Sequence, residues 1–315
     1  MENEKYKKYE ELEGTLLDGR YFLEKLIGIG GMAIVFRAKD TYTNDNTVAI
    51  KMLKDEIACD KTMLKRFKNE FRVENDIRHT NIVSMYEFCT STEKKYMVME
   101  YVDGVTLKKY LKLKKEPLSF GEVMSYTIQT LMALKVAHDA GIIHRDVKPQ
   151  NVMVLRSGRI KVMDFGIAKL PNAETVTMTD KAIGTVYYMS PEQASAKPID
   201  CRSDLYSLGA MIYELATGKL PFDGESPVSI AVMQINKEPI PPREINPKIP
   251  VGLEQIILCA MSKKPSERFQ SADAMLDYAK RLQKDPSIKF ENLKIRGKMS
   301  NFMSFVRRIF KVRRK

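Results

Sequence analysis

The segment His144-Arg145-Asp146-Val147-Lys148-Pro149-Gln150-Asn151 constrains this 315-residue chain more than any other part of its sequence. Within six positions it offers a carboxylate, a lysine and an amide, which can supply a base, a cation and a metal ligand at one point. Asp164-Phe165-Gly166 follows thirteen residues after Asn151, and its carboxylate can bind Mg²⁺ together with the Asn151 amide, because hard cations take oxygen ligands. Composition alone would also fit a polar loop, but the order of the two strings makes a chance match negligible.

A glycine-rich segment, Gly28-Ile29-Gly30-Gly31-Met32-Ala33-Ile34-Val35, lies between two predicted strands. Glycines let a backbone approach phosphates closely and leave amide N–H groups to meet them, although such clusters are usually only turns. A dinucleotide-binding fold would need a helix directly after the glycines. Ile34-Val35-Phe36 instead predicts another strand, so the dinucleotide interpretation is disfavoured.

Val48-Ala49-Ile50-Lys51 places a lysine at the end of an apolar strand, some twenty residues after the glycines. An isolated lysine at a strand end is usually part of the solvated surface. The spacing from the glycines, and Glu70 on the next predicted helix as an ion-pair partner, favour a functional role for Lys51.

The remaining pattern predicts a small β-rich part followed by a larger helical part. Strands are expected over 21–27, 34–38, 47–53, 82–88 and 96–102, and a helix over 61–78. After Gly104 we expect mostly helices, one of them opened by a capping box at Ser119–Glu122 and ending near Gly141. Further helices are expected over 201–217, 228–237, 252–261 and 272–283, and a hairpin joins 152–155 to 160–163. The mixed-charge residues 1–14 are expected to be loosely packed.

These strings, in this order, resemble the eukaryotic-type protein kinase family over about 20–283, more than four-fifths of the chain. The segments Gly30-Gly31-Met32-Ala33, Ser190-Pro191-Glu192-Gln193-Ala194 and Pro221-Phe222-Asp223-Gly224 are most similar to those of bacterial serine/threonine kinases. Many such kinases are membrane-anchored and carry extracellular penicillin-binding-type repeats after a membrane span. This sequence shows neither the span nor the repeats, and one expectation is that it represents the cytoplasmic part of such a protein.

The resemblance implies an α+β, two-lobed protein kinase fold. A kinase domain would occupy residues 20–285, between an N-terminal extension of residues 1–19 and a basic amphipathic tail of residues 286–315. Within it, a small β-rich N-lobe with one main helix would span about 20–100. A larger, mostly helical C-lobe would span about 104–285.

The resemblance also implies a site for the ATP phosphates. The glycine-rich loop would cover them, Lys51 would contact the α- and β-phosphates, and Glu70 would hold Lys51 in place. The implied residues of the loop are Ile27, Gly28, Ile29, Gly30, Gly31, Met32, Ala33, Ile34 and Val35.

An adenine site is implied next to it. Met99 is similar to the gatekeeper residue of the family, and Glu100 and Val102 would offer backbone hydrogen bonds to the base. Ala49 and Met153 would lie on its two faces.

For catalysis, the resemblance implies that Asp146 orients the substrate hydroxyl and accepts its proton, while Lys148 neutralises the transferring phosphoryl group. Asn151 and Asp164 would hold Mg²⁺, with Mn²⁺ as an alternative. Lys148, two residues after Asp146, is typical of the serine/threonine class, and Thr185 resembles the residue that contacts Asp146 in that class. The expected acceptor is therefore a Ser or Thr hydroxyl.

The segment between Gly166 and Ser190 indicates how activity is regulated. Thr175, Thr177 and Thr179 alternate along it, which by itself is typical of any flexible loop. Arg145 directly precedes Asp146, and this resembles kinases whose phosphorylated loop docks onto that arginine. We expect autophosphorylation at these threonines, with a homodimer for phosphorylation in trans.

Ala33, Thr80 and Ser190 depart from the family pattern in small ways, and Glu74 departs from it more strongly. Glu74 lies four residues after Glu70, on the same helix face, where the family generally places an apolar residue against Phe165. Either the helix register differs slightly, or the helix is displaced until a partner repositions it. A buried structural ion pair is also implied, between Glu192 and Arg268.

Composition excludes several other classes of protein. At 44% hydrophobic and 29% charged residues, the chain is in the range of globular proteins. Its four cysteines lie far apart, which excludes a disulfide scaffold and argues against a zinc finger. The N-terminus is hydrophilic, and no run approaches the roughly 18 apolar residues of a membrane span. A cytoplasmic location is expected.

The net charge of +12 is concentrated at the C-terminus. Nine basic and no acidic residues lie between Lys294 and Lys315, so residues 1–293 carry only +3. Apolar residues in the tail recur at helical spacing: Phe302, Phe305, Val306, Ile309 and Phe310. The tail either packs as a terminal helix, stays solvated, or binds an anionic membrane surface; nucleic-acid binding is disfavoured.

The predicted function is transfer of the γ-phosphate of Mg-ATP to Ser or Thr hydroxyls of proteins, in signalling. A catalytically silent scaffold is the rival from a different class, with Glu74 as its only support. A small-molecule phosphotransferase of related fold is a second rival. It is disfavoured because Thr185 and Ser190-Pro191-Glu192 belong to peptide recognition.

Overall fold

The computed structural model describes residues 7–90, 93–165 and 184–293. The chain divides into two compact units, and each is described by itself. Unit 1 comprises the described residues of 1–110 and 136–181, and unit 2 those of 111–135 and 182–315. Helices α4 (Leu107–Lys114) and α5 (Phe120–Asp139) each contribute residues to both units.

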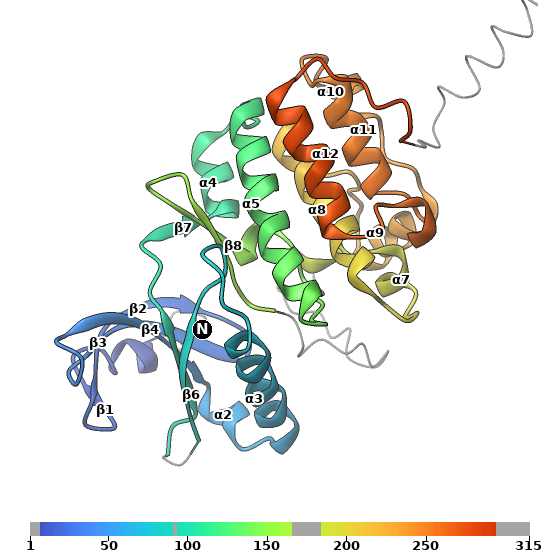
Figure 1. The fold of residues 1–315 in the computed structure, drawn as a ribbon. Coiled ribbons are helices and arrows are strands. Elements are labelled where there is room, and N and C mark those ends of the chain that lie inside the picture. Colours follow the sequence, from blue (N-terminus) through green and yellow to red (C-terminus); the bar gives the residue numbers. More distant parts are fainter. Residues whose placement is uncertain (1–6, 91–92, 166–183, 294–315) are drawn as a thin grey trace, which may run out of the picture. The chain divides into compact units, whose positions relative to one another are not determined.

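Unit 1 is built on a six-stranded antiparallel sheet with the order β1-β2-β3-β4-β6-β5 (Figure 1). Its strands are β1 (Leu16–Leu17), β2 (Tyr21–Ile29), β3 (Ala33–Asp40), β4 (Asn46–Leu53), β5 (Met85–Cys89) and β6 (Tyr96–Glu100). β2 and β3 pair up to Ile29 and Ile34, so the glycine-rich segment forms the turn of a hairpin. This placement agrees with the loop expected between two strands.

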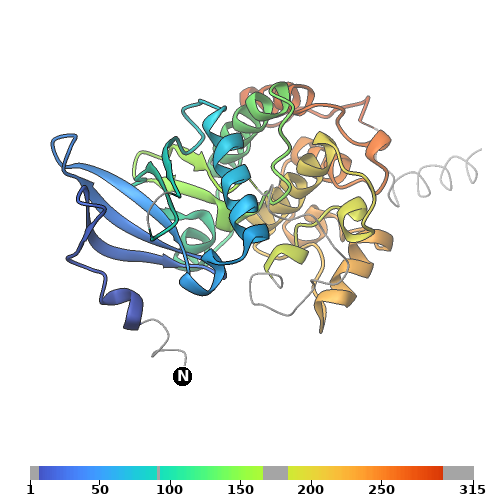
Figure 2. The ribbon, with the colours of Figure 1, turned by 90° about the horizontal axis from the view of Figure 1, so that it is seen from below.

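Helices α2 (Asp55–Ala58) and α3 (Lys61–Asn75) follow β4, and α3 runs along the sheet (Figure 2). Asp60 caps α3 because its carboxylate accepts hydrogen bonds from the N–H groups of Thr62 and Met63. The rings of Phe67 and Phe71 pack on Phe88 of β5. This apolar contact fixes the helix face that carries Glu70 and Glu74.

The expectation that residues 1–14 are loosely packed is wrong for the described part of that segment. Tyr9 is only 5% exposed and packs with Leu17 and Tyr21 against the sheet. The Gly14 N–H also donates to the Leu23 carbonyl at 2.8 Å. The polar composition of the segment concealed one large apolar side chain, whose burial outweighs the charge of its neighbours.

A second sheet of unit 1 has the order β7-β8-β9, with β7 (Gly104–Thr106), β8 (Val152–Leu155) and β9 (Ile160–Val162). The β8–β9 hairpin was predicted, whereas β7 was not, because helices were expected from Gly104 onward. A Cβ atom at Gly104 would collide with the Val154 carbonyl oxygen, so β7 pairs closely with β8 only because residue 104 is glycine.

Unit 2 is helical and centres on α8 (Cys201–Thr217), in which every residue from Ser203 to Thr217 is buried. Helices α11 (Val251–Ala260) and α12 (Ala272–Lys284) pack against α8 (Figure 1). A Cβ atom at Gly209 would lie 2.8 Å from the Ala260 Cβ, so a glycine is needed for this close approach. The remaining elements are α7 (Pro191–Ala194), α9 (Pro227–Asn236), α10 (Pro242–Ile245) and the short 3₁₀ helix η2 (Pro265–Glu267).

Within unit 2, the expected Glu192–Arg268 pair is present, with two hydrogen bonds of 2.7 Å between the guanidinium and the carboxylate. The capping box that opens α5 is present as well, at Ser119 and Glu122. The α+β architecture expected from the sequence, a β-rich part followed by a larger helical part, is present. No helix among the described residues is long and apolar enough to cross a membrane.

Candidate active site

Lys51 connects two carboxylates that come from distant parts of the sequence. Its Nζ lies 2.5 Å from Glu70 Oε1 on α3 and 2.5 Å from Asp164 Oδ1, which follows β9. The antiparallel pairing of β4 with β3 and β6 brings Lys51 between Val35 and Met97. The expected Lys51–Glu70 pair is therefore formed, and α3 is not displaced from the sheet.

The ionisation of Lys51 is set by its surroundings. Burial opposes the charged form, but the carboxylates of Asp164, Glu70 and Glu74 outweigh it and raise the pKa of Lys51 above its ordinary value. The lysine is thus held as a cation. A fixed cation at a strand end, next to a glycine-rich turn, can neutralise part of a polyphosphate.

A second cluster surrounds Asp146. Lys148 Nζ lies 2.9 Å from Asp146 Oδ2, and Asn151 Nδ2 donates to the same oxygen at 3.0 Å and to the Asp146 carbonyl at 2.9 Å. All three side chains are buried or nearly so. His144 Nδ1 accepts a hydrogen bond from the Asp146 N–H at 3.2 Å. Lys148 and Asn151 thus hold the carboxylate of Asp146 through Oδ2, and the other two contacts hold its backbone.

Two residues of these clusters have positive φ angles, 65° at Arg145 and 58° at Asp164. Non-glycine residues in this region carry backbone strain, which persists only where the surroundings enforce it. Arg145 directly precedes Asp146, and Asp164 contacts Lys51. The strained backbone therefore lies at Asp164 and directly before Asp146, the two carboxylates for which the sequence predicts a chemical role.

Most of the predicted adenine residues share one apolar cluster. Ala49 and Met99 are buried in it, and Val35 and Val102 pack against it. Met153 lies on β8, where it pairs with Thr106 of β7 and Lys161 of β9.

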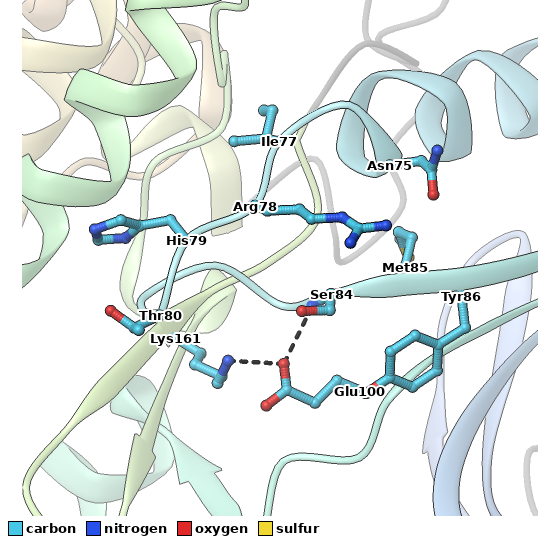
Figure 3. A pocket seen from close by; sticks show the side chains of 10 residues that line it. All are labelled: Asn75, Ile77, Arg78, His79, Thr80, Ser84, Met85, Tyr86, Glu100 and Lys161. Carbon is cyan, nitrogen blue, oxygen red and sulfur yellow. Dashed lines mark hydrogen bonds and ion pairs between the residues drawn. The ribbon is translucent and has the colours of Figure 1, made fainter. Parts of the chain in front are cut away.

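Glu100 is engaged within the chain in two ways. Its N–H donates to the Ser84 carbonyl at 2.9 Å, and its carboxylate accepts from Lys161 at 2.7 Å and from the Ser84 N–H at 3.2 Å. Figure 3 shows the two contacts of the carboxylate in the wall of a pocket of about 520 Å³, which Arg78 and His79 also line. Any contact from Glu100 to a base therefore falls to its backbone carbonyl.

The glycine at position 28 is not required by the packing of the chain. A Cβ atom there would meet only the Val35 side chain, at 3.6 Å, and the backbone does not adopt a positive φ. A Cβ atom at position 28 would thus make only ordinary contact with Val35, the residue that pairs with Lys51 on β4. This observation fits a loop that must approach a phosphate closely.

The donors near Asp164 fit a hard divalent cation. The Asp164 carboxylate is 34% exposed, and the Asn151 amide directs its nitrogen to Asp146, so its carbonyl oxygen faces the opposite side of the group. The Met163 N–H bonds to the Asn151 backbone carbonyl at 3.0 Å, which holds the two predicted ligands on adjoining segments. No group of three or more His, Cys, Asp or Glu ligands occurs among the described residues. One carboxylate and one amide suit an ion that keeps waters and phosphate oxygens as its other ligands.

Four predicted residues remain untested by this geometry. Thr175, Thr177 and Thr179 lie outside the described residues. Thr185 lies in unit 2, where its carbonyl accepts from the Tyr188 N–H at 3.1 Å.

Sequence reasoning missed three contributions to the site. His144 orients Asp146 by accepting a hydrogen bond from the Asp146 N–H, and the centroid of the His144 ring lies 4.5 Å from that of Phe165. Met163, directly before Asp164, packs on the apolar cluster of Ala49. Glu74 accepts a hydrogen bond from the Phe165 N–H. His144 belongs to the motif His144–Asn151, and Met163 directly precedes the motif Asp164–Gly166, which was the available signal.

Comparison with known proteins decides the family. The family described as "Protein kinase domain" matches residues 21–279. The chain belongs to the protein kinase family. The expected resemblance to bacterial serine/threonine kinases is confirmed, and the chain is a protein kinase domain of the transferase class. Protein kinases use ATP and a divalent metal ion.

Individual relatives agree with this assignment. A probable serine/threonine-protein kinase of Clostridium acetobutylicum is 46% identical over 264 residues, which are 84% of this chain and 40% of the relative. Serine/threonine-protein kinase PrkC of Bacillus subtilis is 41% identical, with the same coverage of both chains. The crystal structure of the Mycobacterium tuberculosis PknI kinase domain matches with a TM-score of 0.67 at 25% identity, covering 85% of this chain and 98% of that one. This chain thus spans about 40% of the length of the curated relatives it matches.

Proposed function

We propose that this kinase domain transfers the γ-phosphate of Mg-ATP to Ser and Thr hydroxyls of protein substrates. The observation that carries the proposal is the bridge from Lys51 to Glu70 and Asp164, because it joins the sheet, α3 and the segment after β9 around one cation. A catalytically silent scaffold would not need to hold this cation among three carboxylates.

In this proposal the chain binds ATP through its β-sheet unit. Lys51, held by Glu70, contacts the α- and β-phosphates, and the glycine-rich turn covers them. The base lies against the cluster of Ala49 and Met99, and the backbone of Glu100 and Val102 offers it hydrogen bonds. The packing of the chain does not require a glycine at position 28, and this supports a role for Gly28 in the close approach of the turn.

Asp146 orients the acceptor hydroxyl and takes its proton, and Lys148 neutralises negative charge on the transferring group. The transition state of phosphoryl transfer is largely metaphosphate-like, so positioning and charge stabilisation matter more than a strong base. The contacts of Asp146 to Lys148, Asn151 and the backbone fit this requirement, because they fix the carboxylate in advance of binding.

Asn151 and Asp164 hold the divalent cation, for which we propose Mg²⁺, with Mn²⁺ able to replace it. A bound divalent ion neutralises the charge of the phosphate oxygens and orients them. The pairing of Asp164 with Lys51 leaves the carboxylate next to the position proposed for the phosphates.

The choice of acceptor and the regulation are inferred from the sequence. Lys148 and Thr185 favour Ser or Thr over Tyr as the acceptor. We propose that Thr175, Thr177 and Thr179 are autophosphorylated, in trans within a homodimer, and that the added charge orders their loop through Arg145.

The test is transfer of labelled γ-phosphate from Mg-ATP to a generic basic protein acceptor. Asp146→Asn keeps the shape of the side chain but removes the base, so kcat should fall by about 10²- to 10⁴-fold while the affinity for ATP changes little. Asp45→Asn, in an exposed turn, is the matched control and should keep full activity. Transfer at wild-type rate by Asp146→Asn would refute the proposal.

A further inference from the structure

Glu74 makes a contact that neither the mechanism above nor the family pattern uses. It lies on α3, one turn after Glu70, and is only 2% exposed. Its Oε1 accepts a hydrogen bond from the backbone N–H of Phe165 at 2.7 Å. A carboxyl group is costly to bury unless it is hydrogen-bonded, so this contact accounts for its presence inside unit 1.

The group that Glu74 contacts is the peptide between Asp164 and Phe165. The orientation of this peptide depends on the backbone angles of Asp164, whose φ of 58° lies in the left-handed region. A non-glycine residue remains there only if neighbouring contacts enforce it. Glu74 supplies one such contact from α3, and the His144 ring packs against Phe165 at 4.5 Å.

Helix α3 is therefore connected to Asp164 and Phe165 by two sets of contacts, which start from residues one helical turn apart. The first runs from Glu70 through Lys51 to the Asp164 carboxylate. The second runs from Glu74 to the Phe165 N–H. The first fixes the side chain of Asp164 and the second its backbone, so together they define where the carboxylate can lie.

An apolar residue at position 74 could not do this, since it has no acceptor for the Phe165 N–H. A glutamine could, because its side-chain carbonyl oxygen can take the place of Oε1. Glutamine also has nearly the same size and shape as glutamate, so it keeps both the acceptor for the Phe165 N–H and the packing around position 74.

We propose that Glu74 is a positioning residue, which holds the Asp164–Phe165 peptide against α3 and so keeps the Asp164 carboxylate in place to bind the divalent cation. This inference rests on the proposed function in one respect only, the assignment of Asp164 as a metal ligand. From the sequence alone, Glu74 was the one residue in favour of a catalytically silent scaffold. In the present proposal, Glu74 instead supports activity.

The test compares Glu74→Gln with Glu74→Leu. Its main readout is the affinity for ADP, measured by calorimetry once with and once without Mg²⁺. The ratio of these two affinities, called here the Mg²⁺ ratio, measures how much of the binding depends on the metal. Residues that support metal ligands typically contribute 10- to 100-fold to metal affinity or activity. In Glu74→Leu, the Mg²⁺ ratio and kcat should therefore each fall by about tenfold. In Glu74→Gln, the Mg²⁺ ratio and kcat should both stay within about threefold of wild type, which is less than the effect of losing a supporting group.

Phe71→Leu is the packing control. It weakens the contact of α3 with Phe88 but leaves the Glu74 hydrogen bond intact. It should lower Tm without changing the Mg²⁺ ratio, whereas a merely structural role for Glu74 would make Glu74→Leu behave in the same way. If Glu74→Leu does not fold, Glu74→Met, apolar and of similar length, takes its place.

An unchanged Mg²⁺ ratio in the apolar variant would overturn the proposal. So would equal losses in Glu74→Gln and Glu74→Leu, because the hydrogen-bond acceptor would then be irrelevant. If wild type transfers no phosphate, the proposed function fails, but the Mg²⁺ ratio still tests the role of Glu74.

Discussion

Lys51 holds two carboxylates through one ammonium group, and this arrangement has an energetic consequence at the scale of single residues. Glu70 is buried and Lys51 nearly so, and the Asp164 carboxylate meets the same Nζ atom. A buried charge that loses its partner keeps its desolvation cost without compensation. The stability of unit 1 should therefore depend on keeping this set complete.

Replacing Lys51 by Met should destabilise the chain by about 3 kcal/mol, because Glu70 is then buried without its cation. Adding Glu70→Leu to Lys51→Met should recover part of the loss, since the stranded carboxylate is removed. Urea unfolding of both single variants and the double variant measures this. Losses that simply add would contradict the account.

For single residues, the sequence predicted contacts between motif residues but not the contact of Glu74. The Lys51–Glu70 pair and the closeness of Asp146 to Asn151 were predicted, because ordered motifs define both partners. The hydrogen bond from the Phe165 N–H to Glu74 was not, since it joins positions 91 residues apart. Helical spacing places Glu74 on the correct face of α3, but it cannot indicate which backbone group that face will meet.

Among the elements, the long and strongly patterned ones were the best predicted. α8 begins and ends where expected, between its N-cap Asp200 and the left-handed Gly218. The short strand β7 was missed, because three residues carry no recognisable period and Gly104 acts through a contact with Val154. The N-terminal segment was misjudged for a similar reason, since its tertiary contacts involve few apolar residues, chiefly Tyr9.

α7 and the segment after η2 are joined by the Glu192–Arg268 pair, whose side chains are 7% and 0% exposed. Burial opposes ionisation of Glu192, but the hydrogen bonds and charge of Arg268 prevail and lower its pKa below the ordinary value. A lowered carboxyl pKa means that the unfolded chain binds the proton more tightly. The stabilisation is therefore present above the unfolded pKa of about 4.3 and is lost as the pH falls through the folded value.

Glu192→Gln should consequently be less stable than wild type at pH 7, by about 2–3 kcal/mol for a hydrogen-bonded buried pair that loses its charge. The difference should shrink as the pH falls from about 5 towards 3, when the wild-type carboxylate takes up its proton. Tm measured against pH for the two chains tests this. A difference that stays constant over this range would show that the pair is not ionic.

For the whole molecule, the distribution of charge suggests a role for the tail. Residues 294–315 lie outside the described residues, and they carry nine of the positive charges and no negative ones. Basic residues near an anionic leaflet contribute on the order of 1 kcal/mol each, and burial of aromatic side chains adds to this. We therefore propose that the tail binds anionic membrane surfaces.

The full chain should co-sediment with vesicles that contain phosphatidylserine, and a chain ending at residue 293 should not. Vesicles of phosphatidylcholine alone serve as the control for charge, and raised salt should weaken binding because exposed charges are screened. Equal sedimentation of the two chains with anionic vesicles would remove the membrane proposal.

The proposed function is that of an autonomous serine/threonine kinase. The most direct measurement is incubation of the purified chain with Mg-ATP, beside Asp146→Asn, followed by mass spectrometry of its phosphorylation sites. The account predicts phosphothreonine among Thr175, Thr177 and Thr179 in the wild type and none in the variant. Binding of ATP without phosphate on the chain or on a generic acceptor would contradict it.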